Sequence, residues 1–121
     1  MEFELSGHAG LKLWKQALTN IVFKKGPDLT TRQLSVLLIV FLEPKKHTVR
    51  GLAASLNVSK PVITRCIDSL SIQGLVKRVR DEEDRRSVLI QRTVKGAVFL
   101  TDFAELIEKS YLENQVKLNN I

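Results

Sequence analysis

The stretch that most constrains the fold of this chain is SKPVITRCIDSLSIQG, residues 59–74. Its first residue, Ser59, suits a helix N-cap because a serine hydroxyl can accept a hydrogen bond from a first-turn amide. Pro61 is tolerated in that turn, and Gly74 can take the left-handed conformation that ends a helix. At about 100° per residue, one face is apolar and comprises Ile63, Ile67 and Leu70, with Cys66 at its margin. The opposite face is small, polar and cationic, which suits either a nucleic-acid groove or a solvated surface.

A second short helix is expected just before this one. Thr48 is a suitable N-cap for residues 49–56, whose apolar side chains fall on one face and are Val49, Leu52, Ala53 and Leu56. Asn57 tolerates the left-handed conformation that ends a helix, and Ser59 opens the next helix two residues later. Two short helices joined by about three residues predict a helix-turn-helix motif.

After Gly74 the sequence period changes from that of a helix to that of a strand. Residues 75–80, LVKRVR, and residues 87–92, SVLIQR, mix β-branched and cationic side chains. The residues between them, 81–86, are all charged and therefore suit an exposed turn. We predict a β-hairpin with a charged tip, and a hairpin that directly follows a helix-turn-helix is a wing.

Three longer helices complete the expected fold. Apolar residues recur at helical spacing from residue 9 to about 24. A capping box of Thr30 and Gln33 opens a second helix that ends before Pro44. Thr93 caps a last helix that runs to about residue 118. The loop at residues 45–47, KKH, is expected to be basic and solvent-exposed.

Positive charge is concentrated in the middle of the chain. Residues 45–96 hold 12 Lys or Arg and 5 Asp or Glu, a net charge of +7, whereas residues 1–44 carry +1 and residues 97–121 carry −2. Positive charge beside a candidate recognition helix is the electrostatic pattern of a nucleic-acid-binding protein. Small soluble proteins are also often basic without that function, and the localisation favours nucleic acid.

These observations predict a mainly α fold with a small β-hairpin, a winged helix-turn-helix flanked by N- and C-terminal dimerisation helices. The length suits a single domain spanning residues 1–121. Within it we expect terminal helices at residues 9–25 and 94–118 and a DNA-binding core at residues 29–92.

Other function classes find little support. No apolar run approaches the length of a membrane span and no signal sequence is evident, so a cytoplasmic protein is expected. The single cysteine, Cys66, cannot form an internal disulfide, and with His8 and His47 it gives no zinc spacing. The sequence holds no catalytic constellation, so we expect no enzyme, no cofactor and no metal. For Cys66, a small buried hydrophobe is favoured over a redox switch.

Residues 29–96, 68 of the 121, resemble the MarR family of winged helix-turn-helix transcription regulators. The matching positions are Leu29-Thr30 with Gln33, Thr48-Val49 with Leu52-Ala53, Val58-Ser59, Thr64-Arg65, Asp68 with Leu70, Gly74-Leu75-Val76 with Arg78, the wing residues Asp81, Asp84, Arg85 and Arg86, and Thr93 with Gly96. Arg92 departs from the family, which usually has an apolar residue there. Family members also usually have more helical sequence after this position, where 25 residues follow Gly96 here.

The resemblance implies a homodimer on a pseudo-palindromic site in double-stranded DNA, with recognition helices in successive major grooves and wings over flanking minor grooves. It implies groove or phosphate contacts for Ser59, Lys60, Thr64 and Arg65, and a wing contact for Arg86, held in place by Asp68. Independently, a carboxylate facing DNA is repelled by phosphate, so Asp68 needs a cationic partner from the wing. The full set of expected DNA contacts is Thr48, Ser59, Lys60, Pro61, Val62, Thr64, Arg65, Ser69, Arg80, Arg85 and Arg86, with Asp68 and Asp84 supporting the wing.

The terminal helices carry more apolar surface than a core of this size can cover, which predicts a dimer contact. The expected residues are Leu11, Trp14, Leu18, Ile21, Leu100, Phe103, Ile107, Tyr111 and Leu118. The alternative is a winged-helix protein-docking or RNA-binding module without operator specificity. RNA is less favoured because no aromatic residues alternate with the basic ones. The sequence leaves open whether a small-molecule effector binds.

Overall fold

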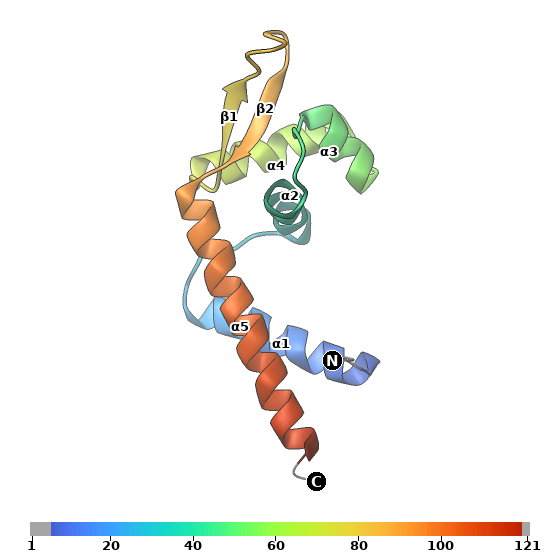
Figure 1. Cartoon of the computed structure of the whole chain (residues 1–121), viewed down its shortest axis with the longest axis vertical. Helices are drawn as coiled ribbons and strands as arrows, with labels where there is room; N and C mark the ends of the chain where they lie inside the picture. Colours follow the sequence, from blue (N-terminus) through green and yellow to red (C-terminus); the bar gives the residue numbers. More distant parts are fainter. Residues whose placement is uncertain (1–5, 120–121) are drawn as a thin grey trace. The chain divides into compact units, whose positions relative to one another are not determined.

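The computed structural model describes the backbone of residues 6–119 and the side chains of residues 6–113. Within that range the elements are α1 (Gly7–Phe23), α2 (Thr31–Leu42), α3 (Val49–Leu56), α4 (Lys60–Ile72), β1 (Val76–Arg80), β2 (Val88–Arg92) and α5 (Val94–Asn119), as Figure 1 shows. This confirms the expected fold class, a mainly α winged helix-turn-helix with a two-stranded antiparallel hairpin.

The chain divides into two compact units, and α5 contributes to both. The winged-helix unit consists of residues 29–99, and the terminal-helix unit consists of the residues up to 28 together with those from 100 onward. The winged-helix unit thus contains α2, α3, α4, both strands and the first turns of α5.

Local hydrogen bonds set the ends of the helices in the winged-helix unit, as the sequence predicts. The Thr30 hydroxyl accepts from the Gln33 amide at 3.1 Å, while the Gln33 side chain accepts from the Thr30 amide at 2.9 Å. Thr48 accepts a bond of 3.0 Å from an amide in the first turn of α3. Asn57 and Gly74 take positive φ angles of 53° and 75°. These residues therefore end α3 and α4 as left-handed caps.

α1 differs in detail from the expected helix. It begins two residues earlier than predicted, because the Ser6 side chain accepts a hydrogen bond from the Ala9 amide at 3.2 Å and caps the helix. At the other end, Lys25 has the positive φ of 55°, so the left-handed residue is a lysine. Gly26 was the expected end signal, but it follows one residue later.

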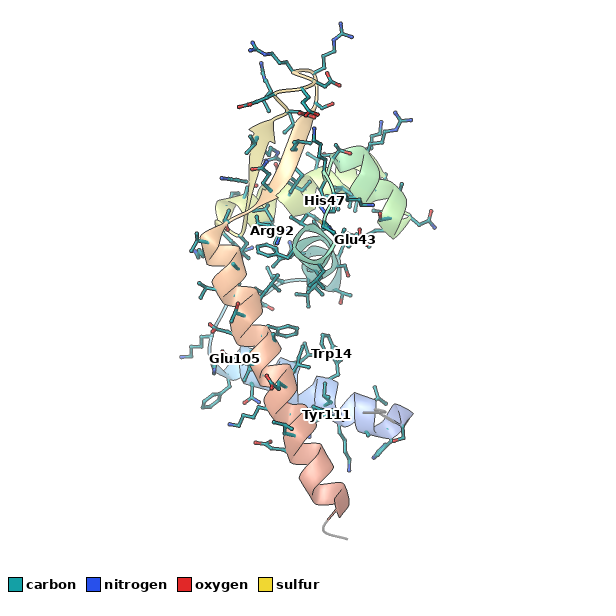
Figure 2. The ribbon with its side chains drawn as sticks, in the orientation of Figure 1. Trp14, Glu43, His47, Arg92, Glu105 and Tyr111 are labelled. Atoms are coloured by element: carbon teal, nitrogen blue, oxygen red, sulfur yellow. The ribbon has the colours of Figure 1, made fainter. Side chains whose placement is uncertain are left out.

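The hairpin pairs β1 with β2 from Val76 opposite Arg92 to Arg80 opposite Val88. A single further bridge joins β2 to the loop before α3, between His47 and Ile90. The expectation that residues 45–47 are solvent-exposed is therefore wrong for His47, which is 5% exposed. Its Nε2 lies 2.9 Å from the carbonyl oxygen of Glu43. Both residues are labelled in Figure 2.

The core of the winged-helix unit is built from α2, α3, α4 and both strands. The predicted apolar face of residues 59–74 is buried, including Cys66. The buried apolar residues of this unit are Val36, Leu37, Val40, Leu52, Ala53, Ile63, Cys66, Ile67, Leu70, Leu75, Val76, Leu89 and Ile90. Because this core holds one face of α4, it also determines which face of α4 is left for solvent.

The terminal-helix unit is held by an aromatic contact between α1 and α5. The rings of Trp14 and Phe103 meet edge to face, with centroids 5.7 Å apart and planes at 87°. Ala17, Leu106 and Ser110 are buried in the same unit. Several large apolar side chains of α1 nevertheless stay exposed, namely Leu11, Trp14, Leu18, Val22 and Phe23.

Candidate nucleic-acid interface

α4 presents a polar and cationic face opposite the face that lies in the core. In Figure 1 this helix lies beside α3, at the base of the hairpin. Two full positive charges, on Lys60 and Arg65, lie on the exposed side of the helix. The expected contacts on and next to α4 that are exposed are Ser59, Lys60, Pro61, Thr64 and Arg65, while Val62 and Ser69 are half-buried.

Three of the expected polar contacts differ in whether their hydroxyl groups already form a hydrogen bond within the chain. Ser59 occupies the N-cap position of α4, but within the described chain its hydroxyl caps no amide, so the predicted capping bond is wrong. The Thr48 hydroxyl is engaged in capping α3. The Ser69 hydroxyl accepts from Gln73 Nε2 at 3.3 Å. Of these three hydroxyls, that of Ser59 is therefore the best placed to bond an outside group.

Asp68 is paired with a wing cation, although with a different one from that implied by the resemblance. The guanidinium of Arg78 donates a hydrogen bond to Asp68 Oδ1 and forms an ion pair with it. β1 leaves α4 directly, so its third residue, Arg78, returns beside the helix, whereas Arg86 lies in the turn beyond both strands. The expectation that Asp68 holds Arg86 is therefore corrected: Asp68 supports the wing through the strand.

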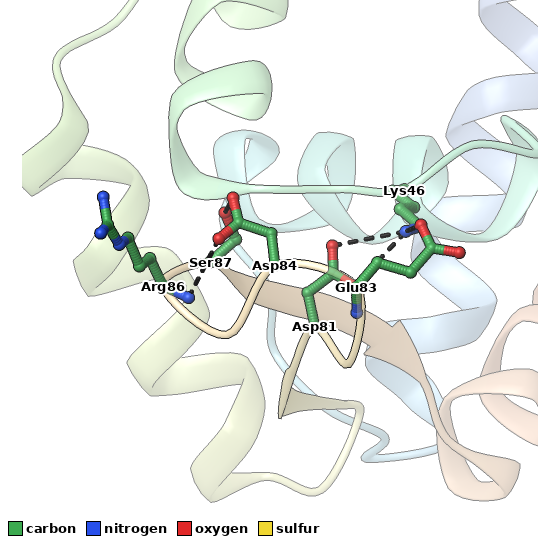
Figure 3. Close-up of polar contacts among 6 residues, drawn as sticks. All are labelled: Lys46, Asp81, Glu83, Asp84, Arg86 and Ser87. Carbon is green, nitrogen blue, oxygen red and sulfur yellow. Dashed lines mark hydrogen bonds and ion pairs between the residues drawn. The ribbon is translucent and has the colours of Figure 1, made fainter.

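The wing tip is organised by Asp84. Its Oδ1 accepts from the Arg86 amide at 3.2 Å and its Oδ2 accepts from the Ser87 hydroxyl at 3.2 Å, as Figure 3 shows. This arrangement is a local side-chain turn, which orders the backbone beneath the basic residues. Arg80, Arg85 and Arg86 are exposed.

Sequence reasoning missed one member of this region, Lys46. Its ammonium nitrogen lies 2.7 Å from Glu83 Oε2 and 3.4 Å from each carboxylate oxygen of Asp81. The residues involved are 35 and 37 positions apart in the chain. No local spacing rule links positions so far apart, and the basic character of residues 45–47 was the only signal available.

Arg92, the departure from the MarR-like pattern, lies over an aromatic ring. Its guanidinium carbon is 5.9 Å from the ring centroid of Phe41, a cation–π geometry. The same ring lies against Gly96, where an added Cβ would be 2.9 Å from a Phe41 ring carbon and 2.3 Å from the Leu75 carbonyl oxygen. Arg92 is exposed, and the aromatic ring under its guanidinium takes the place of the apolar contact expected at this position.

Cys66 is buried between the helices of the winged-helix unit. Burial raises the pKa of its thiol, and the positive charge of Arg32 opposes this rise only in part. A raised thiol pKa lowers the fraction of reactive thiolate. The environment therefore supports the interpretation of Cys66 as a small buried hydrophobe.

Two further kinds of feature were sought among the described residues, a metal site and a membrane-spanning helix. Among their side chains, no three or more of His, Cys, Asp and Glu come together as a metal site. None of the helices within residues 6–119 is both long and apolar enough to cross a lipid bilayer.

The sequence profile of the MarR family matches residues 29–88. This chain belongs to the MarR family. The match covers the helix-turn-helix and the wing as far as the first residue of β2, so it contains every exposed residue of α4 discussed above. Both α1 and α5 lie outside the MarR match.

Two curated relatives and one solved structure illustrate the likeness. The chain is 32% identical over 80 residues to the HTH-type transcriptional repressor YetL of Bacillus subtilis, covering 64% of this chain and 47% of YetL. It is 35% identical over 71 residues to the organic hydroperoxide resistance transcriptional regulator of the same organism, covering 59% of this chain and 48% of the relative. The chain thus aligns with about half the length of each curated relative.

The solved structure is that of a complex between MepR of S. aureus and DNA. It is 21% identical and superimposes with a TM-score of 0.70 over 93% of this chain and 86% of MepR. At this identity the likeness bears on the fold, and it agrees with the MarR winged helix-turn-helix architecture seen here.

Proposed function

We propose that this chain is a transcription regulator that binds a specific pseudo-palindromic site in double-stranded DNA as a homodimer. The observation that carries the proposal is the division of α4 into two faces. Ile63, Ile67 and Leu70 lie in the core, which leaves Lys60 and Arg65 exposed with the small side chains Ser59, Pro61 and Thr64 between and beside them. Such a face can enter a major groove and contact both base edges and phosphates.

The wing supplies the second contact surface of this proposal. Arg80, Arg85 and Arg86 are exposed, and the bonds to Asp84 order the turn that carries the last two. Long cationic side chains on an ordered turn suit a minor groove or its flanking phosphates. The likeness to a transcriptional repressor and a transcriptional regulator, and the DNA in the MepR crystal, support the same function.

The homodimer rests on the exposed apolar face of α1. Leu11 is 69% exposed and Val22 is 73% exposed, and Leu18 belongs to the same face of the helix. Phe103, by contrast, is buried against Trp14 within the chain, and Leu100, Ile107 and Tyr111 are partly covered. Leu118 lies outside the described side chains. The proposed dimer contact therefore consists mainly of α1.

Recovery of bound DNA from a genomic fragment pool, followed by binding measurements on the enriched sequence, tests this function. We expect a two-fold symmetric motif and an affinity that falls by about 0.9 log units per phosphate contact for each tenfold rise in salt. Single-stranded RNA of the same length is the matched control. Random recovery of fragments, or affinity for duplex DNA that does not depend on salt, would contradict the proposal and favour the protein-docking or RNA-binding alternative.

A further inference from the structure

The wing tip contains an ion-pair cluster that the proposed DNA contacts do not use. Lys46, from the loop between α2 and α3, reaches Glu83 at 2.7 Å and Asp81 at 3.4 Å. Figure 3 shows both carboxylates directed toward the lysine, while the side chain of Arg86 points away from it on the other side of the turn. The tip therefore has an acidic side, which faces the loop, and a basic side.

The cluster is joined to the backbone of the turn. Oδ1 of Asp81 also accepts a hydrogen bond of 3.0 Å from the Glu83 amide, and the Asp81 amide donates a bond of 3.0 Å to the Ser87 carbonyl. The bond from the Glu83 amide, followed by the attraction of Lys46, lowers the pKa of Asp81. The bond to Glu83 raises the pKa of Lys46. Both directions mean that this geometry favours the charged forms.

The charge of the tip explains why such a cluster matters for a DNA-binding wing. Residues 80–86, RDEEDRR, carry three cations and four carboxylates, a net charge of −1. A tip with a net negative charge is not attracted to the DNA phosphates. Attraction requires that the carboxylates be neutralised or directed away from the DNA. Lys46 brings the sum to zero and engages two of the four carboxylates.

We propose that Lys46 is a wing-positioning residue, which holds the acidic side of the tip against the α2–α3 loop and so presents Arg85 and Arg86 to duplex DNA. The positioning rests on the contacts of Lys46 with Asp81 and Glu83, and its consequence for DNA rests on the function proposed above. Lys46 itself need not touch DNA.

Hydrogen exchange of the free protein tests the positioning without DNA. Lys46→Gln should make the amides of residues 81–87 exchange about two- to five-fold faster, the range expected when exposed ion pairs are lost. Lys46→Arg should restore the slow exchange. Lys45→Gln is the matched control, because Lys45 is adjacent but pairs with Glu43 at 3.6 Å. Glu83→Gln should accelerate the same amides although it makes the tip more positive, which separates positioning from a lost positive charge.

Affinity for a short duplex then tests the consequence. Lys46→Gln should weaken binding more than Lys45→Gln does, and Lys46→Arg should bind like the unmodified protein. Unchanged exchange in Lys46→Gln would overturn the positioning role and make any loss of affinity a direct phosphate contact. Faster exchange with the affinity of the Lys45→Gln control would overturn the link to DNA. If the unmodified protein bound no duplex, the proposed function would fail. The difference in amide exchange would still show that Lys46 positions the wing tip.

Discussion

The amide of Ile90 donates a 2.8 Å hydrogen bond to the carbonyl of His47, which ties the α2–α3 loop to the outer edge of β2. Ile90 lies in the core, so this bond fixes the loop relative to the base of the wing. Lys46 is the residue next to His47, and the bond therefore places it within reach of the wing tip. The same bond covers part of the free edge of β2. An uncovered strand edge could pair with a strand of another chain.

The two cations of the α4 face should contribute to DNA binding in different ways. Arg65→Ala should cost about 1–3 kcal/mol on the best site and relax the preference at one base position, because a guanidinium can bond two acceptors of one base. Lys60→Ala should weaken all sequences more evenly, because an ammonium at the helix start suits a phosphate. Competition binding with site variants and random duplex measures both effects. Equal losses of Arg65→Ala on specific and random DNA would show that it contacts only phosphate.

The dimer should depend on Leu11. This side chain is 69% exposed, so Leu11→Asp should leave each chain folded but weaken dimerisation by about 2 kcal/mol or more. Sedimentation velocity across a range of concentrations measures the association. Ile72→Asp is the control, since Ile72 is 87% exposed but belongs to the winged-helix unit. The contact would have to lie elsewhere if the two variants behaved alike.

Gly96 should be intolerant of any side chain. An added Cβ would lie 2.3 Å from the Leu75 carbonyl oxygen, a backbone atom that cannot move aside without shifting the chain. Gly96→Ala should therefore lower the free energy of unfolding by about 1–3 kcal/mol, despite the better helix propensity of alanine. Urea unfolding measures this change. Gly26→Ala, where no atom lies within 4 Å of the added Cβ, should stay close to the unmodified protein.

The Asp81 carboxylate should leave the wing cluster in acid. Because the folded pKa of Asp81 is lowered, its contribution to stability is complete above the ordinary pKa of an aspartate, about 4, and is lost as the pH falls through the lower folded value. The side-chain carboxyl carbon shift of Asp81, followed by NMR, should therefore be constant near neutral pH and titrate below the usual aspartate range. The spectrum of Asp81→Asn, which lacks this titration, identifies the resonance. A midpoint at or above the ordinary value would contradict the prediction.

Most features that involve neighbouring residues could be predicted from the sequence, with the Ser59 capping bond as an exception. The Thr30 and Gln33 capping box, the Thr48 cap and the left-handed Asn57 and Gly74 all lie where the residue types indicate. Each depends on atoms within about one turn of helix, so the order of residues determines the geometry. The buried face of α4 could be predicted in the same way, since helical periodicity fixes which side chains share a face.

Only the tertiary structure decided which distant groups meet. The sequence places a cation near Asp68, but the course of β1 beside α4 makes that cation Arg78 instead of Arg86. The pairing of Lys46 with residues 81 and 83, and the burial of His47 at the edge of β2, both depend on how the loop and hairpin approach each other. That approach is set by the packing of the whole core, which includes Ile90 and Leu52. Because this packing depends on many distant residues at once, it cannot be read from the spacing of neighbouring residues.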